Sequence, residues 1–310
     1  MAARRRRRTV RWAAVAAATV VCVGGVVYAG TGAAETRHGD TDRNATPGNA
    51  TPARDVAAAR EAEQTRSADG PPYAGVVPGT ATPAGRRLVA SDEFDGAGLD
   101  TSKWRAYKSL SSNKVSHFEP AQVGVADGEM RIVGHGRDAS GKQNVSGAVC
   151  WCGTGGDQTY GIWAIKAKLD AGKGYAPAMM LWPKSNAWPT DGETDIIETV
   201  QPKRISDVAS VHWGDPPSGL RESGKTWGDF TKWHVFWVDW QPTYIKIYVD
   251  RTLVYDTTTS SKHPVIPAKP MHLVLQQEPG PYAPKVWLPA PDGSTPDQVV
   301  VHVDWARYYQ

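Results

Sequence analysis

Short runs of alternating apolar and polar residues recur along the chain from about residue 87 to its end. Alternation with a period of two is typical of β-strands that bury one face. Gly, Pro, Asp and Asn fill the intervals, and these residues favour turns. The pattern predicts strands at residues 130–133, 145–152, 161–169, 176–182, 193–200, 210–213, 233–240, 244–249, 253–255, 271–276 and 299–309. So many short strands, without a long amphipathic helix between them, predict an all-β jelly-roll β-sandwich over residues 87–310.

The pattern before residue 87 is different. Residues 1–30 join a run of arginines to a long apolar stretch, as in an export segment that is either a cleaved signal peptide or a membrane anchor. Residues 31–86 are rich in Ala, Thr, Pro and Gly, which predicts a flexible linker. Because the positive head of such a leader stays inside, residues 87–310 are expected outside the cell, secreted or tethered to the outer face of the membrane.

Charge and aromatic content narrow the class of partner. The net charge is +3, and the arginines of residues 4–8 account for it, so no nucleic-acid partner is expected. The chain has 13 Trp against 4 Phe. A Trp side chain fills a core well, but its flat apolar face can also stack against a sugar ring. The tryptophan content is therefore consistent with core packing and with stacking against sugar rings.

The two cysteines of the folded part, Cys150 and Cys152, flank Trp151 in a strand-like run. Residues two apart on a strand share a face, so a disulfide between them is conceivable but strained. Two free buried thiols are the alternative. With no further Cys pair and no His-Glu-x-x-His pattern, the sequence has no zinc motif.

Three acids occupy one of the predicted strands, residues 193–200, whose other members are largely apolar. Burying carboxylates is costly, so such a placement calls for a reason. Glu193 and Asp195 share one strand face, whereas strict alternation puts Glu198 on the other. One extra residue, a β-bulge at Ile196-Ile197, would return Glu198 to the face of the other two. The segment therefore predicts a row of three carboxyl groups.

Two carboxyl groups suffice to cleave a glycosidic bond. One donates a proton to the leaving oxygen and the other attacks the anomeric carbon or activates water. Crowding of like charges raises one pKa, which keeps a proton on one group. Four strand steps separate Cα atoms by about 13 Å, whereas a retaining pair needs carboxyls about 5–5.5 Å apart and an inverting pair about 6.5–9.5 Å. The spacing along the strand does not distinguish a retaining from an inverting pair. The alternative to a catalytic site is a row of solvated acids on the protein surface.

The segment Glu193-Thr-Asp-Ile-Ile-Glu198 resembles the active-site signature of glycoside hydrolase family 16 in its bulged form. Further segments resemble that family in the same order along the chain: residues 91–96, 99–104, 160–169, 178–183, 188–189, 211–214, 233–240, 245–250 and 303–309. The resemblance spans about residues 88–310. It implies a concanavalin A-like jelly roll with a concave substrate cleft.

The resemblance also assigns roles to single residues. It implies that Glu193 is the nucleophile, Asp195 a helper carboxylate and Glu198 the acid/base of a retaining reaction. By the same resemblance, sugars contact Trp182, Trp188, His212, Trp213 and Gln276. Gln276 stands where the family often has Asn, and Thr194 replaces the more usual Ile.

Metals and cofactors follow from the resemblance as well. Catalysis would need no cofactor. Many relatives hold a structural calcium between the opening segment and the last strand, where Asp304 is a candidate ligand. An ordinary surface acid is the alternative for Asp304, so the sequence leaves the metal open.

The bulged form resembles β-1,3-glucanases of the laminarinase type. We therefore expect an exported, monomeric endo-β-1,3-glucanase that acts on β-glucan and accepts β-1,3-1,4-glucan, attached to a membrane only through its N-terminal segment. One alternative is a hydrolase or transglycosylase for another polysaccharide, such as an exopolysaccharide or a galactan. A second is a non-catalytic carbohydrate-binding jelly roll. Residues 109–114 and 215–227, predicted to be loops, do not reveal the sugar.

Overall fold

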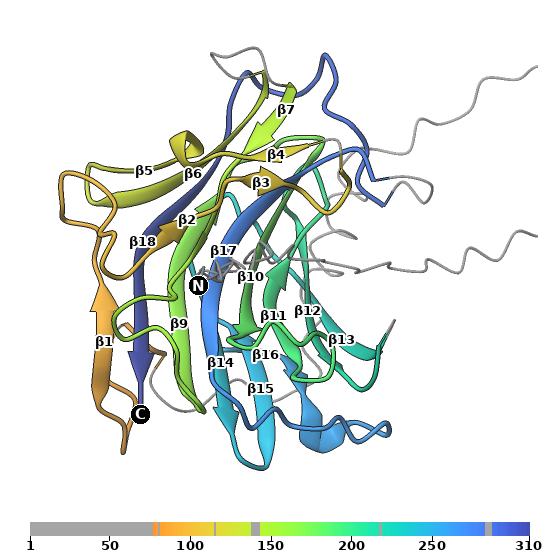
Figure 1. The fold of residues 1–310 in the computed structure, drawn as a ribbon. Helices are drawn as coiled ribbons and strands as arrows, with labels where there is room; N and C mark the ends of the chain where they lie inside the picture. Colours follow the sequence, from red (N-terminus) through yellow and green to blue (C-terminus); the bar gives the residue numbers. More distant parts are fainter. Residues whose placement is uncertain (1–76, 80, 115, 138–142, 217–218, 283–286) are drawn as a thin grey trace, which may run out of the picture.

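The computed structural model describes residues 77–79, 81–114, 116–137, 143–216, 219–282 and 287–310. These residues form two β-sheets and two short 3-10 turns, at Pro120–Gln122 and Thr257–Thr259, so the predicted all-β class is confirmed (Figure 1). Gly and Pro are frequent in the connections between the strands, as the sequence pattern indicates.

One sheet has eleven strands and the other has seven. The eleven-stranded sheet contains β1 (Leu88–Asp92), β3 (Ser109–Leu110), β4 (His117–Phe118), β5 (Val123–Ala126), β6 (Glu129–Arg137), β7 (Gln143–Ser146), β9 (Gly161–Leu169), β14 (His234–Gln241), β15 (Tyr244–Val249), β16 (Thr252–Asp256) and β18 (Val299–Tyr309). The seven-stranded sheet runs in the order β13 (Leu220–Trp227), β12 (Ser206–Trp213), β11 (Glu193–Glu198), β10 (Tyr175–Pro183), β17 (Met271–Pro279), β8 (Ala148–Cys150) and β2 (Arg105–Ala106).

The main hydrophobic core lies between these two sheets. Trp163 and Phe236 enter it from the eleven-stranded sheet, and Leu181 and Leu273 enter it from the seven-stranded sheet. All four side chains are fully buried. Since neighbouring residues on a strand point to opposite faces, the residues between them lie on the outer faces of the sheets. This alternation is what leaves one face of the seven-stranded sheet free for polar side chains.

Most predicted strands are confirmed, and three have the predicted bounds: β9, β15 and β18. The run at residues 145–152 is two strands, because β7 belongs to one sheet and β8 to the other. Gly147 lies at the crossing, where an added Cβ would come within 2.9 Å of the Gln122 carbonyl oxygen. The chain therefore crosses from one sheet to the other at a glycine, where no side chain can clash with this carbonyl oxygen.

The prediction of a loop over residues 215–227 is wrong for its second half, which forms β13. This strand reads Leu-Arg-Glu-Ser-Gly-Lys-Thr-Trp and lies at the edge of its sheet. An edge strand with one solvent-facing side needs few apolar residues, so alternation of hydrophobicity does not reveal it. Residues 109–114 likewise begin with the two-residue strand β3 rather than with loop.

Part of the predicted linker belongs to the fold. Val77 is buried in a cluster with Trp305 and Tyr309 on the outer side of the eleven-stranded sheet. Gly79 comes so close to the Trp305 ring that an added Cβ would lie 2.1 Å from it. Val77 and Gly79, which the sequence pattern assigns to the linker, therefore pack against the folded part. The predicted leader and the rest of the predicted linker lie outside the described residues.

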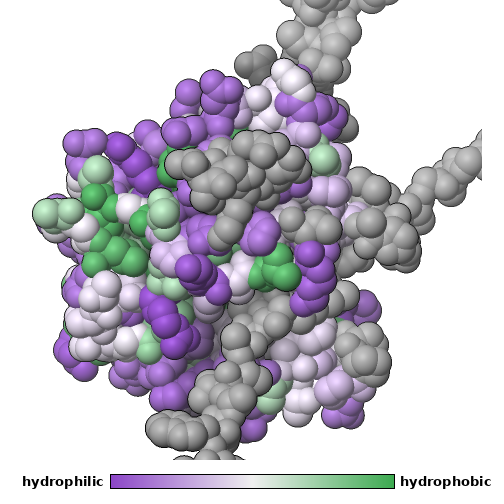
Figure 2. All heavy atoms as spheres, turned by 45° about the horizontal axis from the view of Figure 1, so that its top comes forward, coloured by the Kyte–Doolittle hydropathy of each residue, from purple (hydrophilic) through white to green (hydrophobic). Residues whose placement is uncertain are grey.

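The surface is mostly hydrophilic on the side shown in Figure 2, with hydrophobic atoms gathered mainly in one patch at its edge. Such a surface agrees with apolar side chains that are collected between sheets. Among the described residues, no helix has the length and apolar character needed to cross a membrane.

Candidate active site

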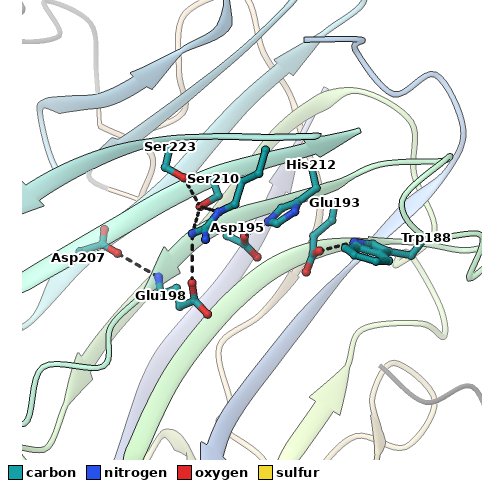
Figure 3. A network of polar contacts seen from close by, with 9 residues as sticks. Trp188, Glu193, Asp195, Glu198, Asp207, Ser210, His212 and Ser223 are labelled. Atoms are coloured by element: carbon teal, nitrogen blue, oxygen red, sulfur yellow. Dashed lines mark hydrogen bonds and ion pairs between the residues drawn. The ribbon is translucent and has the colours of Figure 1, made fainter. Parts of the chain in front are cut away.

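The three predicted acids lie on β11, near the middle of the seven-stranded sheet. Glu193 pairs with His212 and Asp195 with Ser210, whereas Glu198 pairs with Val208. Between these last two pairs, Ile196 and Ile197 of β11 stand opposite the single residue Ala209 of β12. The pairing of β11 with β10 shifts at the same two isoleucines. The predicted bulge is confirmed, and both of its isoleucines are buried in the core. It brings Glu198 to the face that carries Glu193 and Asp195, which we call the acid face (Figure 3).

Glu193 is almost completely buried, and its partner comes from the preceding turn. The indole Nε1 of Trp188 donates a hydrogen bond to its Oε2 at 2.6 Å. Trp188 precedes a cis proline, Pro189, in the segment between β10 and β11. A hydrogen bond from an N–H group stabilises the ionised form of a carboxyl group. Trp188 therefore favours negative charge on Glu193.

Asp195 contacts a side chain of the neighbouring strand. Nε2 of His212 lies 3.2 Å from its Oδ2, and both side chains are buried. The ring of His212 also lies near that of Trp188, with centroids 6.1 Å apart. Trp188 and His212 thereby link Glu193 and Asp195 into one group of contacts (Figure 3).

Glu198 faces an arginine from β13. Nη2 of Arg221 lies 3.5 Å from its Oε2. The guanidinium group is held more firmly by Ser210, to whose Oγ it donates from Nε at 3.0 Å and from Nη2 at 2.7 Å. Ser210 contacts Ser223 of β13 in turn, with 3.0 Å between the two hydroxyl oxygens. Three neighbouring strands therefore position the cation that meets Glu198.

Burial dominates the electrostatics of the acid face. It raises the pKa of Glu198 to about 8, with a further contribution from Asp195 that Arg221 partly offsets. Burial and the charge of Asp195 also raise the pKa of Glu193 well above its usual range, while the Trp188 hydrogen bond acts in the opposite direction. Carboxyl groups crowded in this way cannot all be ionised at neutral pH. The acid row therefore retains a proton that it can donate.

The predicted sugar-contacting residues divide between the two faces of the sheet. Trp182 and Gln276 lie on the acid-face side of β10 and β17, and both are almost completely buried. Nε1 of Trp182 donates to Oδ1 of Asn186 at 2.9 Å. His212 and Trp188 contact the acids directly, as described above. Their contacts with a sugar remain predictions.

The placement of Trp213 corrects the prediction made for it. Its side chain is buried in the main core together with Val211, on the opposite side of β12 from His212. Adjacent residues on a strand cannot both point to the acid face. Trp213 therefore packs between the sheets and is not positioned to stack against a sugar from the acid face.

A fourth carboxyl group lies on this side of the sheet, and no sequence pattern predicts its place there. Glu278 of β17 is buried, and its Oε2 accepts hydrogen bonds from Ser111 and Tyr282, each at 2.5 Å. Burial raises its pKa to about 7, and its charge contributes to the raised pKa of Glu198. No motif connects these residues along the chain. The only sequence signal is an acid placed in the apolar strand at 271–279.

Cys150 and Cys152 form a disulfide, which decides between the two alternatives left open by the sequence. Cys150 is buried beside Met180 and Val274, on the side of the sheet that carries the acids.

Asp304, the candidate calcium ligand, has a cationic partner of its own. Nζ of Lys166 lies 2.8 Å from its Oδ2. Within the part of the chain that the structure describes, no three His, Cys, Asp or Glu side chains gather in a way that could hold a metal ion. Asp304 therefore has a cationic partner within the chain, and calcium binding there stays a prediction.

Comparison with protein families matches residues 146–307 to Glycosyl hydrolases family 16. This match covers more than half of the chain and includes the whole acid row. The chain belongs to Glycosyl hydrolases family 16. The expected resemblance is thus confirmed, and the acids of β11 lie where the family signature was identified.

Two curated relatives of this chain are named for their action on glucan. Glucan endo-1,3-beta-glucosidase A1 of Niallia circulans is 27% identical over 213 residues, which is 56% of this chain and 30% of the relative. Beta-glucanase of Rhodothermus marinus is 30% identical over 186 residues, which is 54% of this chain and 64% of the relative. This family 16 chain therefore spans less than two thirds of either relative.

A solved structure confirms the jelly-roll fold. LamAcat from Zobellia galactanivorans is 26% identical, with a TM-score of 0.61, and the match covers 72% of this chain and 97% of that one. The alignment thus accounts for nearly all of the solved chain, and this family 16 chain shares its fold.

Proposed function

We propose that this protein is a retaining endo-β-1,3-glucanase that also accepts β-1,3-1,4-glucan. The observation that carries the proposal is the acid row on the bulged strand β11, with a different partner for each acid. Membership of family 16 and the relatives named as glucanases support the substrate class. A non-catalytic sugar-binding role does not require buried acids with raised pKa values next to one another.

In the proposed mechanism, Glu193 is the nucleophile. The Trp188 N–H group stabilises its ionised form, which attacks the anomeric carbon. The pKa values of Glu193 and Glu198 are both raised, so the pair retains a proton at neutral pH. We assign this proton to Glu198, the acid/base, and the negative charge to Glu193, which the Trp188 N–H group stabilises. Glu198 donates this proton to the departing glycosidic oxygen and then accepts one from the water that releases the sugar. Asp195, held by His212, lies between them and adjusts the charge of both.

Export, cofactor use and oligomeric state belong to the proposal as well. We infer from the leader sequence that the enzyme acts outside the cell, either secreted or tethered through its N-terminal segment. The three acids supply both the nucleophile and the proton, so the reaction needs no cofactor. We propose a monomer, with polysaccharide as its partner.

The test is hydrolysis of a panel of polysaccharides that contains laminarin, mixed-linkage β-glucan, galactans and bacterial exopolysaccharides. The purified full-length chain should release reducing ends from laminarin, and NMR should show products that first appear with the β configuration. Glu193→Ala should abolish this activity. Azide should restore cleavage of an activated aryl β-glucoside by this variant and yield an α-glycosyl azide, because the small anion replaces the missing carboxylate.

Asp127→Ala is a suitable control for this test, because Asp127 is an exposed acid in a turn far along the chain from the acid row. It should behave as the wild type. Cleavage of a galactan without cleavage of any β-glucan would refute the proposed substrate, and products that first appear with the α configuration would refute retention.

A further inference from the structure

Asp207 is a buried carboxyl group that the proposed mechanism does not use. It lies on β12 between Ser206 and Val208, and its side chain is on the core side of the strand. It is fully buried, and its Oδ2 has no hydrogen-bond partner in the described residues. No cation is paired with it among the described ion pairs. An unpaired acid in a core is costly, so its presence calls for a reason.

The hydrogen bonds of the Asp207 carboxyl group come from the backbone around the bulge: from Glu198 and from Val208, the residue that pairs with it. Oδ1 of Asp207 accepts a hydrogen bond from the backbone N–H of Glu198 at 3.0 Å (Figure 3). Glu198 is the first residue after the extra isoleucine, where the pairing of β11 with both neighbouring strands shifts. A bulge disturbs the regular ladder, so nearby amides need other acceptors. Asp207 supplies one from the side of the sheet opposite to the Glu198 carboxyl group.

We propose that Asp207 is a positioning residue for the reaction: it holds the bulged backbone at Glu198 and thereby sets the direction of the acid/base carboxyl group. This inference rests on the proposed function, in which Glu198 donates the proton. Asp207 and Arg221 then act on the same residue from two sides. Asp207 fixes the backbone from the core, and Arg221 meets the carboxyl group from the acid face.

The test compares Asp207→Val with Asp207→Asn in the full-length chain. Valine fills a similar volume without an acceptor, so the Glu198 amide loses its partner. We expect kcat/KM on laminarin to fall by about tenfold to a hundredfold, a fraction of what a general acid contributes. Asparagine keeps an oxygen at the same place and should restore most of the activity. Thr226→Val removes a buried hydroxyl group from the residue of β13 that pairs with Asp207, and it should leave kcat/KM unchanged.

A second substrate distinguishes positioning from a general structural role. A dinitrophenyl β-glucoside has a leaving group that departs without a proton, so its cleavage does not depend on the direction of Glu198. Asp207→Val should therefore lose less than about threefold in kcat/KM on this substrate. An equal loss on both substrates, or full activity on laminarin, would overturn the proposal.

The backbone itself offers a measurement that needs no substrate. Amide hydrogen exchange at Glu198, followed by NMR, should be faster in Asp207→Val than in the wild type and close to the wild type in Asp207→Asn. Unchanged exchange in Asp207→Val would overturn the proposal. If the wild type cleaves another polysaccharide of the panel instead of laminarin, only the substrate assignment fails. The same comparison of variants is then made on that polysaccharide.

Discussion

At the scale of residues, the acid row depends on partners that give each carboxyl group a different environment. Glu193 accepts an indole N–H, Asp195 contacts an imidazole and Glu198 meets a guanidinium group. The acids are chemically alike, and they stand within six positions of one another along the chain. Their neighbours therefore decide which one holds the proton.

The first prediction concerns the pH dependence of the reaction. A general acid must be protonated, so kcat/KM should fall above pH 8, the approximate pKa of Glu198. The positive charge of Arg221 lowers this pKa because it stabilises the carboxylate. Arg221→Gln should therefore move the alkaline limb of the pH–rate profile to higher pH, whereas Arg221→Lys keeps a charge and should move it less. A shift to lower pH in Arg221→Gln contradicts the prediction.

At the scale of elements, the two faces of each strand carry different tasks. On β12, Ser210 and His212 serve the acid face, and Val211 and Trp213 serve the core. The bulge in β11 is the exception to strict alternation, and it is what places Glu198 with the other acids. A single inserted residue thus determines whether the strand carries two acids or three on one face.

The second prediction separates the neighbours His212 and Trp213 of β12. Trp213→Ala empties a large volume in the core and should lower the free energy of unfolding by about 3–5 kcal/mol. The molecules of Trp213→Ala that remain folded should have a kcat close to that of the wild type. His212→Ala removes the partner of Asp195 and should lower kcat with a smaller loss of stability. Urea unfolding and kinetics on laminarin measure both effects. A large fall in kcat for folded Trp213→Ala would contradict its placement in the core.

At the scale of the whole molecule, contacts between the two ends of the described chain hold the outer side of the large sheet together. β1 pairs with β18, and Arg307 of β18 donates to both carboxylate oxygens of Glu93, at 2.9 and 2.7 Å. Val77 and Gly79 pack against Trp305 of the same strand. These contacts use cationic and apolar side chains of the chain itself, in the region where many relatives are expected to hold calcium.

The third prediction therefore concerns calcium. Because Lys166 already pairs with Asp304, EGTA should leave the unfolding temperature and the activity unchanged, and added CaCl2 should not raise either. Thermal unfolding followed by circular dichroism, with and without each reagent, measures this. A matched magnesium titration controls for ionic strength. A rise of several degrees with calcium alone would show that another set of oxygen ligands holds the ion.

Much of the fold and of the site could be predicted from the sequence, because the relevant signals are local. Period-two alternation marks the strands, and three acids in one apolar strand mark the reaction. The bulge followed from counting residues between Glu193 and Glu198. The family resemblance placed Trp213 in the cleft, but Trp213 lies on the core side of β12 because adjacent residues of a strand point to opposite faces. The strand β13 was missed because its edge position requires no apolar pattern.

The sequence by itself determined the long strands with alternating apolar residues, the positions of the acids and the place of the extra isoleucine. Periodicity and charge depend only on residues that are close together in the sequence, so they can be recognised without the tertiary structure. Only the tertiary structure decided that Arg221, Asp207 and Glu278 surround Glu198 or influence its charge. These residues come from three different strands, and the register between strands brings them together. Register depends on packing across the whole sheet, which no single segment of the chain encodes.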